Sequence, residues 1–446
     1  MKIPVLLPNI FDHPFTYESD KKVEVGRYVL VPFGKNDAVG VVWDQFEKEK
    51  NNKKFKLKKI KKTFDVNKLN ENSIKFLNWF SEYNIVPKGM ALKLHLLSSE
   101  AIEDLKEKEY LKFNEKLESK KYELSNEQHE AYKDLIKKDE KFRTHVLQGT
   151  TGSGKTIVYF NAIKKKIEEG YQALILLPEI GLTNDFEKKF IDFFGFRPAI
   201  WHSSVTKKNK KIIWSGLASN KIKVVIGARS ALFLPFKNLG LITVDEEHDQ
   251  SYKQQDGFRY SARDLAVMRA QQENIPIILG SATPSLESLN NCVQNRYEHL
   301  VLNNRAGNAQ SPEWQLVDLR NEPVECGIAS ATLRAIKETV NAKQQVLIFL
   351  NRRGYAPVLV CHHCGWTADC SHCDAKLTVH RARGRLICHH CNYQIRQPNQ
   401  CPTCNSQQLI AAGDGTERSA DYLQKCFPAT PVLRIDRDST RKRGAM

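Results

Sequence analysis

Residues 149–156 read Gly-Thr-Thr-Gly-Ser-Gly-Lys-Thr, a pattern typical of loops that hold phosphate groups. Glycines let backbone N–H groups approach phosphate oxygens, a lysine neutralises charge, and a hydroxyl can hold Mg²⁺. The loop follows a strand-like run (THVLQ) and precedes a helical one, which is the context such a loop requires. The predicted ATP-binding residues here are Gly149, Thr150, Thr151, Gly152, Ser153, Gly154, Lys155 and Thr156.

A second set of chemically active residues follows the apolar run Leu241–Val244. Asp245 is predicted to bind Mg²⁺, and Glu246 to orient or deprotonate the water that attacks a phosphate. A third segment, GSATPS at 280–285, also follows an apolar strand-like run, and its hydroxyls could relay the state of the nucleotide. Together with Lys155 and Thr156, the two acids form the predicted catalytic set.

Eight of the 11 cysteines lie in four C-x-x-C pairs between 361 and 404. Each pair places two thiolates on one turn, and Zn²⁺ is usually held by four ligands, so eight cysteines predict two zinc ions. The 14-residue gap after Cys373 suits one ribbon-like site, whereas the five residues after Cys364 are too few to close two turns on one ion. We therefore expect nested structural sites, with the outer ligands Cys361, Cys364, Cys401, Cys404 and the inner ligands Cys370, Cys373, Cys388, Cys391.

The elements that must position these residues alternate between strand-like and helical patterns over 121–320, which predicts an α/β fold with a parallel sheet. Residues 1–48 indicate short strands separated by glycines, and residues 72–120 indicate helices that end in a charged segment. Another strand is expected at 345–351. The predicted strands of the parallel sheet have the sequences THVLQG, ALILLP, KVVIGA, LGLITVDE and IPIILGSAT.

Composition narrows the class of protein. The 446 residues carry 68 Lys and Arg against 51 Asp and Glu, a net charge of +17 that favours nucleic acid or an anionic membrane surface as partner. A hydrophobic content of 41% and the lack of a long apolar run argue against a disordered chain and against a transmembrane helix. The start of the chain does not fit a secretory signal, so we expect a cytoplasmic protein with reduced thiols.

The order of GTTGSGKT, DEEH and GSATPS resembles that of superfamily 2 helicases, which implies RecA-like lobes. Longer blocks are more specific, and the chain resembles the PriA family of replication restart helicases over nearly its whole length. The resemblance implies an ATP-dependent 3′-to-5′ DNA helicase that recognises stalled or branched forks and initiates primosome assembly. The blocks are LLPEIGLT, IGARSALFLPFKNLG, DEEHDQSYKQQDGFRYSARDLAVMRA, IPIILGSATPSLES and FLNRRGYAP.

The resemblance also assigns site residues. Gln128 matches the glutamine that recognises adenine, and the aromatic-rich segment after DEEH matches the loop that couples single-stranded DNA to ATP hydrolysis. Aromatic faces can stack on any base and arginine adds phosphate contacts, so the chemistry agrees. A buried aromatic cluster is the alternative interpretation. The residues matched in this segment are Tyr252, Phe258, Arg259 and Tyr260.

The first residues resemble the family's module that captures a 3′ DNA end. The resemblance places Phe15, Tyr17, Gly34 and Lys58 in its pocket, where an aromatic ring would stack on the terminal base and a lysine would meet phosphate. The family often has Asp between the two aromatics, whereas this chain has Thr16, which offers a neutral and weaker contact.

We expect a β-rich 3′-end-binding domain at 1–62 and a helical linker at 63–120. A first, ATP-binding helicase lobe follows at 121–320, and a partial second lobe at 321–446 carries the zinc insertion 361–404. A winged-helix domain, which the family carries between the 3′-end-binding module and the helicase core, does not fit in the short gap here. The family's late arginine-bearing motif is also lacking, so we expect a C-terminally truncated chain with poor hydrolysis.

Two alternatives to the replication restart helicase remain open. One is a catalytically incomplete fork-binding fragment or scaffold that does not hydrolyse ATP, and the other is a different superfamily 2 DNA translocase. The resemblance implies ATP, Mg²⁺ and two Zn²⁺ ions as cofactors. It implies branched and single-stranded DNA, single-strand DNA-binding protein and other primosome proteins as partners.

Overall fold

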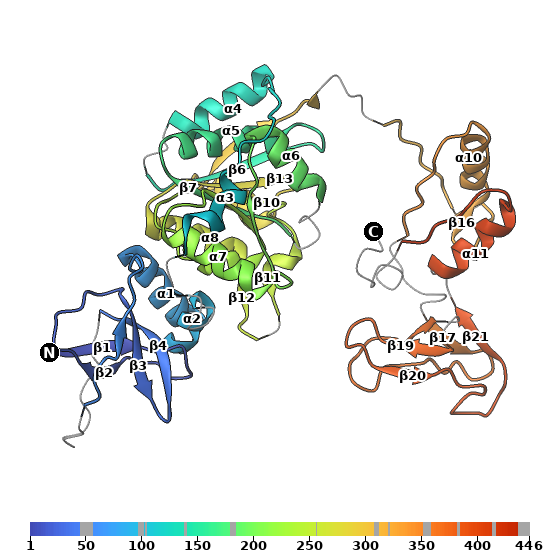
Figure 1. The fold of residues 1–446 in the computed structure, drawn as a ribbon. Helices are drawn as coiled ribbons and strands as arrows, with labels where there is room; N and C mark the ends of the chain where they lie inside the picture. The colour runs from blue at the N-terminus through green and yellow to red at the C-terminus, as the bar shows by residue number, and fades with distance from the viewer. Residues whose placement is uncertain are drawn as a thin grey trace. The chain divides into compact units, whose positions relative to one another are not determined.

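The computed structural model divides into two compact units, Met1–Ser311 and Pro312–Met446 (Figure 1). It describes residues 1–44, 57–96, 102, 105–137, 141–178, 184–255, 257–306, 312–319, 322–350, 358–380, 384–412 and 416–435. Two of the segments that carry the family resemblance, LLPEIGLT and FLNRRGYAP, lie partly outside the described residues, at 179–183 and 351–357.

The first unit begins with a five-stranded antiparallel sheet whose strand order is β2-β1-β4-β3-β5. Gly34 lies in the tight turn between β3 and β4 with a φ of +61°, a conformation that residues with a Cβ rarely adopt. The apolar runs and glycine punctuation of this region therefore correctly predict strands. The strands are β1 (Lys2–Leu6), β2 (Phe15–Glu18), β3 (Tyr28–Phe33), β4 (Asn36–Val42) and β5 (Lys62–Thr63).

A seven-stranded parallel sheet follows, with the order β14-β6-β13-β10-β7-β9-β8. The α/β class and the five strands expected from the sequence are confirmed. The strands are β6 (Thr144–Gly149), β7 (Gln172–Leu176), β8 (Ala199–Trp201), β9 (Val224–Gly227), β10 (Leu239–Asp245), β13 (Ile277–Ser281) and β14 (Glu298–Leu302). A short hairpin, β11 (Lys253–Gln254) and β12 (Tyr260–Ser261), lies outside this sheet.

Helices cover both faces of the parallel sheet, which explains why its strands are continuously apolar. Along β7, Leu174 and Leu176 belong to one buried cluster, whereas Ala173 and Ile175 belong to the other. One face is covered by α4 (Asn126–Lys137), α5 (Lys155–Glu168) and α6 (Asn184–Phe194). The other face is covered by α7 (Lys207–Ala218) and α8 (Ala262–Glu273), while α9 (Leu286–Val293) follows β13.

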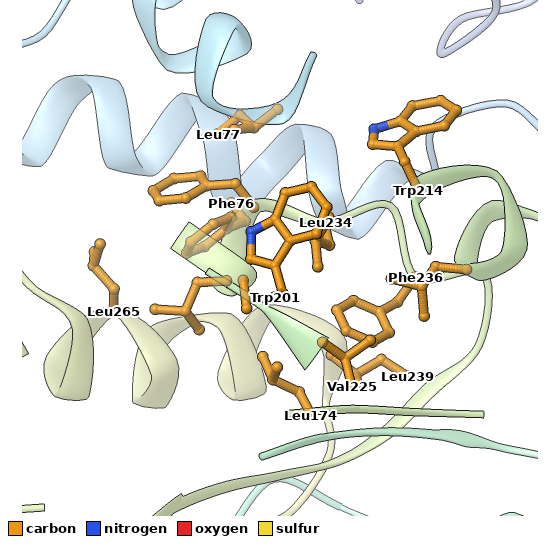
Figure 2. Packing of buried hydrophobic residues seen from close by; sticks show 14 of the residues in the cluster. Phe76, Leu77, Leu174, Trp201, Trp214, Val225, Leu234, Phe236, Leu239 and Leu265 are labelled. Atoms are coloured by element: carbon orange, nitrogen blue, oxygen red, sulfur yellow. The ribbon is translucent and has the colours of Figure 1, made fainter. Parts of the chain in front are cut away.

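The small sheet and the parallel sheet share one buried core. Residues 63–120 contain α1 (Glu71–Tyr83), α2 (Lys88–His95), a 3₁₀ turn at Glu107–Tyr110 and α3 (Leu111–Asn114). Helices α1 and α2 lie between the small sheet and the rest of the unit (Figure 1), and their apolar faces join the same cluster. Figure 2 shows Phe76 and Leu77 of α1 in one cluster with Leu174, Trp201 and Leu265.

The second unit contains short elements around two small cores. Its helices α10 (Ser330–Asn341) and α11 (Thr416–Cys426) share one core with β16, which pairs with β15. Strands β17 to β21 frame the cysteine pairs. The strands are β15 (Val324–Glu325), β16 (Ile328–Ala329), β17 (Val358–Cys361), β18 (Thr378–His380), β19 (Arg385–Ile387), β20 (Gln394–Arg396) and β21 (Leu409–Ala412).

The strand expected at 345–351 is not formed in the described residues 345–350. Ile348 packs against the α10 and α11 core, but Leu347 is 90% exposed and Phe349 is 83% exposed. A strand needs a hydrogen-bonded neighbour, and the part of this unit that is described places none beside this segment. The apolar sequence alone could not reveal that a neighbouring strand is missing from the described part of this unit.

His95, at the end of α2, connects the modules of the first unit. Its Nε2 is 2.8 Å from the Tyr28 hydroxyl of the small sheet, and its Nδ1 is 2.8 Å from the Phe233 carbonyl oxygen of the parallel-sheet region. Trp214 of α7 donates its indole N–H to the His95 carbonyl oxygen at 3.0 Å. Burial lowers the pKa of His95 from 6.5 to about 4.

We predict that the free energy of unfolding falls as the pH is lowered from about 6.5 towards 4. In this window the unfolded chain takes up a proton at His95 while the folded chain does not, so up to about 3 kcal/mol is lost. Urea unfolding at a series of pH values should show this loss, and His95→Gln should flatten it. An identical pH dependence in both proteins would contradict the prediction.

Candidate nucleotide site, DNA contacts and metal centre

The predicted phosphate loop leaves the carboxyl end of β6 and ends where α5 begins at Lys155. Gly154 caps the helix with a φ of +81°, and a Cβ at this position would lie 2.3 Å from the Gln128 amide nitrogen. Lys155 is buried, and its ammonium donates to the Gly149 carbonyl oxygen at 2.8 Å. The loop is thus held closed on itself, with Thr156 next to it in the first turn of α5.

Gln128, the predicted adenine contact, lies on α4 beside this loop. Its side-chain N–H₂ donates to the Ser153 carbonyl oxygen at 2.8 Å, and its amide oxygen accepts from the Ser125 N–H at 3.0 Å. The side chain therefore braces the loop in this structure. Its contact with adenine stays a prediction.

Asp245 ends β10, two strands away from β6 along the same sheet edge. Its Oδ1 accepts from the Glu246 N–H at 3.0 Å, and its Oδ2 accepts from the Tyr159 hydroxyl at 2.9 Å. Burial raises the pKa of Asp245, and the Tyr159 hydrogen bond and the Lys155 charge oppose that rise. The predicted lysine and acid thus lie close enough to interact electrostatically.

Glu246, the predicted water-activating residue, has a φ of +47°, a left-handed backbone conformation that residues other than glycine seldom adopt. The side chain is 46% exposed, so water can reach it. His248 lies 3.6 Å from the Glu246 carboxylate and 2.7 Å from the Ser281 hydroxyl of the GSATPS segment. The acidic segment and GSATPS are therefore joined by a side-chain contact.

Glu247 is a buried carboxylate to which the sequence analysis gave no role. Its Oε1 accepts from the Ser285 N–H at 2.5 Å, and its Oε2 accepts from the hydroxyls of Ser285 and Ser288 at 3.1 and 3.0 Å. Arg263 donates to the same Oε2 at 3.2 Å. Glu247 thus fastens the start of α9 and the start of α8 to the end of β10.

Two of the aromatic residues predicted to contact DNA are buried. Tyr252 is 2% exposed, and its hydroxyl donates to the carbonyl oxygens of Asp245 and Leu176 at 2.6 and 3.0 Å. Tyr260 is 7% exposed and its ring contacts that of Phe80 edge-on. Both rings are thus packed against other parts of the protein in this structure, and their contact with DNA stays a prediction.

The remaining two predicted residues of this segment are accessible. Arg259 is exposed and Phe258 is half-buried, and both lie between β11 and β12. Both ends of the segment are bonded to the DEEH residues. At its start the Tyr252 hydroxyl donates to the Asp245 carbonyl oxygen, and just after its end Arg263 donates to Glu247.

Phe15, the first residue of β2, belongs to a cluster of rings on the small sheet. Its ring centroid lies 5.2 Å from that of Phe33, 5.4 Å from that of Phe11 and 5.0 Å from that of His13. Phe15 is half-buried and Phe11 is 41% exposed, so part of the cluster is open to solvent. Such a surface suits stacking against a base.

The other predicted 3′-end residues surround the same strand. Tyr17 is buried and donates its hydroxyl to the Pro32 carbonyl oxygen at 3.2 Å, whereas Thr16 is half-buried. Gly34 lies in the turn just after β3. Lys58 is exposed, and its backbone carbonyl oxygen accepts a hydrogen bond from the Glu18 N–H of β2 at 2.9 Å. The structure therefore brings all four predicted residues to one region of the small sheet.

The cysteines form two groups, with the nested pairing expected from their spacing. In the outer group the sulfurs of Cys361 and Cys404 are 3.6 Å apart, and in the inner group those of Cys370 and Cys391 are 3.4 Å apart. Within each group all ligand atoms lie within 4.8 Å of one another. A zinc ion with bonds of about 2.3 Å places its sulfurs about 3.8 Å apart, so both donor sets fit Zn²⁺.

Three family models match the chain. They are a DEAD/DEAH box helicase over residues 125–292, a 3′DNA-binding domain (3′BD) of PriA over 4–96, and the Cys-rich region (CRR) domain of the PriA DNA helicase over 370–396. The replication restart protein PriA of Rickettsia conorii is 39% identical over 442 residues, which are 98% of this chain and 67% of that protein. The chain belongs to the PriA family.

Other members of the PriA family match over a smaller part of their length. The protein of Haemophilus influenzae is 45% identical over 305 residues, 68% of this chain and 42% of that protein. The protein of Bacillus subtilis is 38% identical over 329 residues, 72% of this chain and 41% of that protein. The resemblance stated from the sequence, the helicase class and the zinc-binding Cys-rich region are thus confirmed.

The PriA family models cover the parts of the chain unequally. The 3′DNA-binding model ends at 96, so its span includes α1 and α2 as well as the small sheet. The Cys-rich model spans the inner cysteine group but not the outer one. For the outer group, the support is the geometry of the four sulfurs.

We predict that the purified chain holds two zinc ions, and that pairs of substitutions reveal the nesting. Cys361→Ser with Cys404→Ser should remove one ion, whereas Cys361→Ser with Cys370→Ser should remove both. Metal analysis of the purified proteins measures this, with Cys326→Ser as a control that retains both ions. Retention of one ion by the second pair would contradict the nested arrangement.

Proposed function

We propose that this chain acts as an ATP-driven DNA helicase in replication restart, moving 3′ to 5′ and engaging branched forks that carry a free 3′ end. The proposal rests mainly on one observation. The phosphate loop and the acids lie at one sheet edge, in a unit whose core also includes a 3′DNA-binding module. Membership of the PriA family supports the same activity.

In this proposal, backbone N–H groups of residues 149–154 and the Lys155 ammonium bind the phosphates of ATP. Thr156 and Asp245 hold Mg²⁺, which when bound neutralises charge on the phosphate oxygens. Glu246, with its exposed carboxylate, orients the attacking water and accepts its proton. Gln128 contacts the adenine and supports the loop through Ser153.

DNA contacts are assigned to two places in the first unit. The ring cluster around Phe15, with Gly34 and Lys58 nearby, would receive a 3′ end. Phe258 and Arg259 would meet single-stranded DNA, and the contacts at Tyr252 and Arg263 link that segment to the acids. Zn²⁺ in both cysteine groups would stabilise the Cys-rich region.

Single-strand DNA-binding protein and other primosome proteins are proposed as partners on the basis of the family resemblance. We propose the cytoplasm as the location, since the chain would act on chromosomal DNA. Among the described residues, no helix combines the length and the apolar character needed to cross a membrane.

We predict that this chain hydrolyses ATP faster with a forked DNA carrying a free 3′ end than without DNA. Lys155→Ala should abolish the stimulated rate, because it removes the buried ammonium of the loop that is proposed to bind the phosphates. Phosphate release with the fork, with linear duplex and without DNA measures this.

Each outcome of that experiment separates the alternatives. Equal stimulation by fork and linear duplex would favour a different superfamily 2 translocase. Fork binding that weakens steeply with salt, without turnover, would contradict the motor and support a scaffold.

We predict that Phe15→Ala weakens binding to a DNA with a free 3′ end by about 10-fold, since stacking of one base contributes roughly 1–3 kcal/mol. Tyr83→Ala, which removes a 70% exposed ring from α1 of the same unit, is the matched control and should have little effect. Fluorescence anisotropy with free and 3′-blocked ends measures the affinities. A loss of equal size with both ends would contradict a role in recognising the 3′ terminus.

A further inference from the structure

Tyr159 is a buried tyrosine of the nucleotide site that no motif identifies. It lies on α5, three residues after Thr156 and four after Lys155, so helical periodicity brings it to the same face as both. Its ring is fully buried in the cluster that covers one face of the parallel sheet. Its hydroxyl donates to Asp245 Oδ2 at 2.9 Å.

Thr156, one helical turn before Tyr159 on α5, lies close enough to the phenol for its hydroxyl to lower the pKa of Tyr159. Thr156 and Asp245 are the two residues proposed to hold Mg²⁺, and they come from different elements, α5 and β10. The buried Tyr159 hydroxyl is therefore bonded to Asp245 and lies near Thr156. When the phenol proton points to Asp245 and the threonine proton points to the phenol, lone pairs of the threonine oxygen are left for a cation.

The surroundings of Asp245 leave few other groups to orient it. Its Oδ1 is held by the Glu246 N–H, and a Cβ on Gly280 of the neighbouring strand would lie 3.2 Å from that oxygen. The Lys155 ammonium acts on the carboxylate through its charge while donating to Gly149. The second oxygen, Oδ2, accepts a hydrogen bond from the Tyr159 hydroxyl.

We propose that Tyr159 is a positioning residue that holds Thr156 and Asp245 in the arrangement required by Mg²⁺, and so sets the affinity of the nucleotide site for this cation. The proposal rests on the proposed function of the site. Groups that hydrogen-bond to metal ligands commonly change metal affinity by 10–100-fold when removed. In this proposal the phenol acts through Thr156 and Asp245 and does not itself touch nucleotide or metal.

The test uses Tyr159→Phe, which keeps the buried ring and removes the hydroxyl alone. Tyr110→Phe is the matched control, because Tyr110 is also fully buried and its hydroxyl is 2.9 Å from the Ser215 hydroxyl, in another part of the same unit. Binding of a fluorescent non-hydrolysable ATP analogue is measured with increasing Mg²⁺ and in EDTA. Thermal unfolding confirms that each variant is folded.

For Tyr159→Phe we expect the Mg²⁺ concentration at half-maximal binding to rise about 10-fold, with unchanged affinity for the analogue in EDTA. A purely structural role would weaken binding equally in both conditions, which would overturn the proposal. So would a Mg²⁺ requirement equal to that of the Tyr110→Phe protein. Electron paramagnetic resonance of Mn²⁺ with the analogue gives a second measure of cation affinity and should show the same rise.

The result distinguishes this proposal from the proposed function. If the unsubstituted chain binds the analogue with Mg²⁺ and Lys155→Ala does not, the nucleotide site is established whatever Tyr159 does. If the unsubstituted chain does not bind it, the proposed function fails first, and with it the role of Tyr159.

Discussion

The parallel order of the seven-stranded sheet is the constraint on which the nucleotide site depends. Parallel strands end at the same edge, so the loop after β6, Asp245 at the end of β10 and Ser281 at the end of β13 meet there. Strand β13 lies between the other two, and Gly280 allows the Asp245 carboxylate to pass close to it. Burial of both sheet faces keeps this alignment rigid, because any tilt of one strand would open two packed layers.

Much of the fold and of the candidate site was predictable because the signals are local. The phosphate loop, the strands of the parallel sheet and the cysteine pairs are each encoded within a few residues. The contacts of Glu247 and Tyr159 were not predictable, because they join residues distant in sequence, Ser285 for the first and Asp245 for the second. The sequence offered only two weak signals for them, the position of Glu247 as the third acid of DEEH and that of Tyr159 one helical turn after the phosphate loop.

Apolar and aromatic residues were the hardest to interpret. Tyr252 and Tyr260 have the chemistry of base-stacking residues, yet the structure buries both, because an aromatic ring serves equally well in a core. Whether such a ring packs or binds depends on what surrounds it, and that follows from tertiary structure. In segment 345–350 the opposite error occurs. Its apolar sequence is typical of a buried strand, but Leu347 and Phe349 are exposed to solvent.

The buried core that joins the small sheet to the parallel sheet also limits how this protein could exchange parts with its relatives. Trp43 of the small-sheet region donates to Asn78 of α1 at 3.1 Å, and Tyr28 contacts His95 of α2. A recombination point directly after β5 would separate these partners and leave large rings facing water. The small sheet must therefore be exchanged together with α1 and α2, and sequence changes on the two sides of a junction after β5 must be compatible with each other.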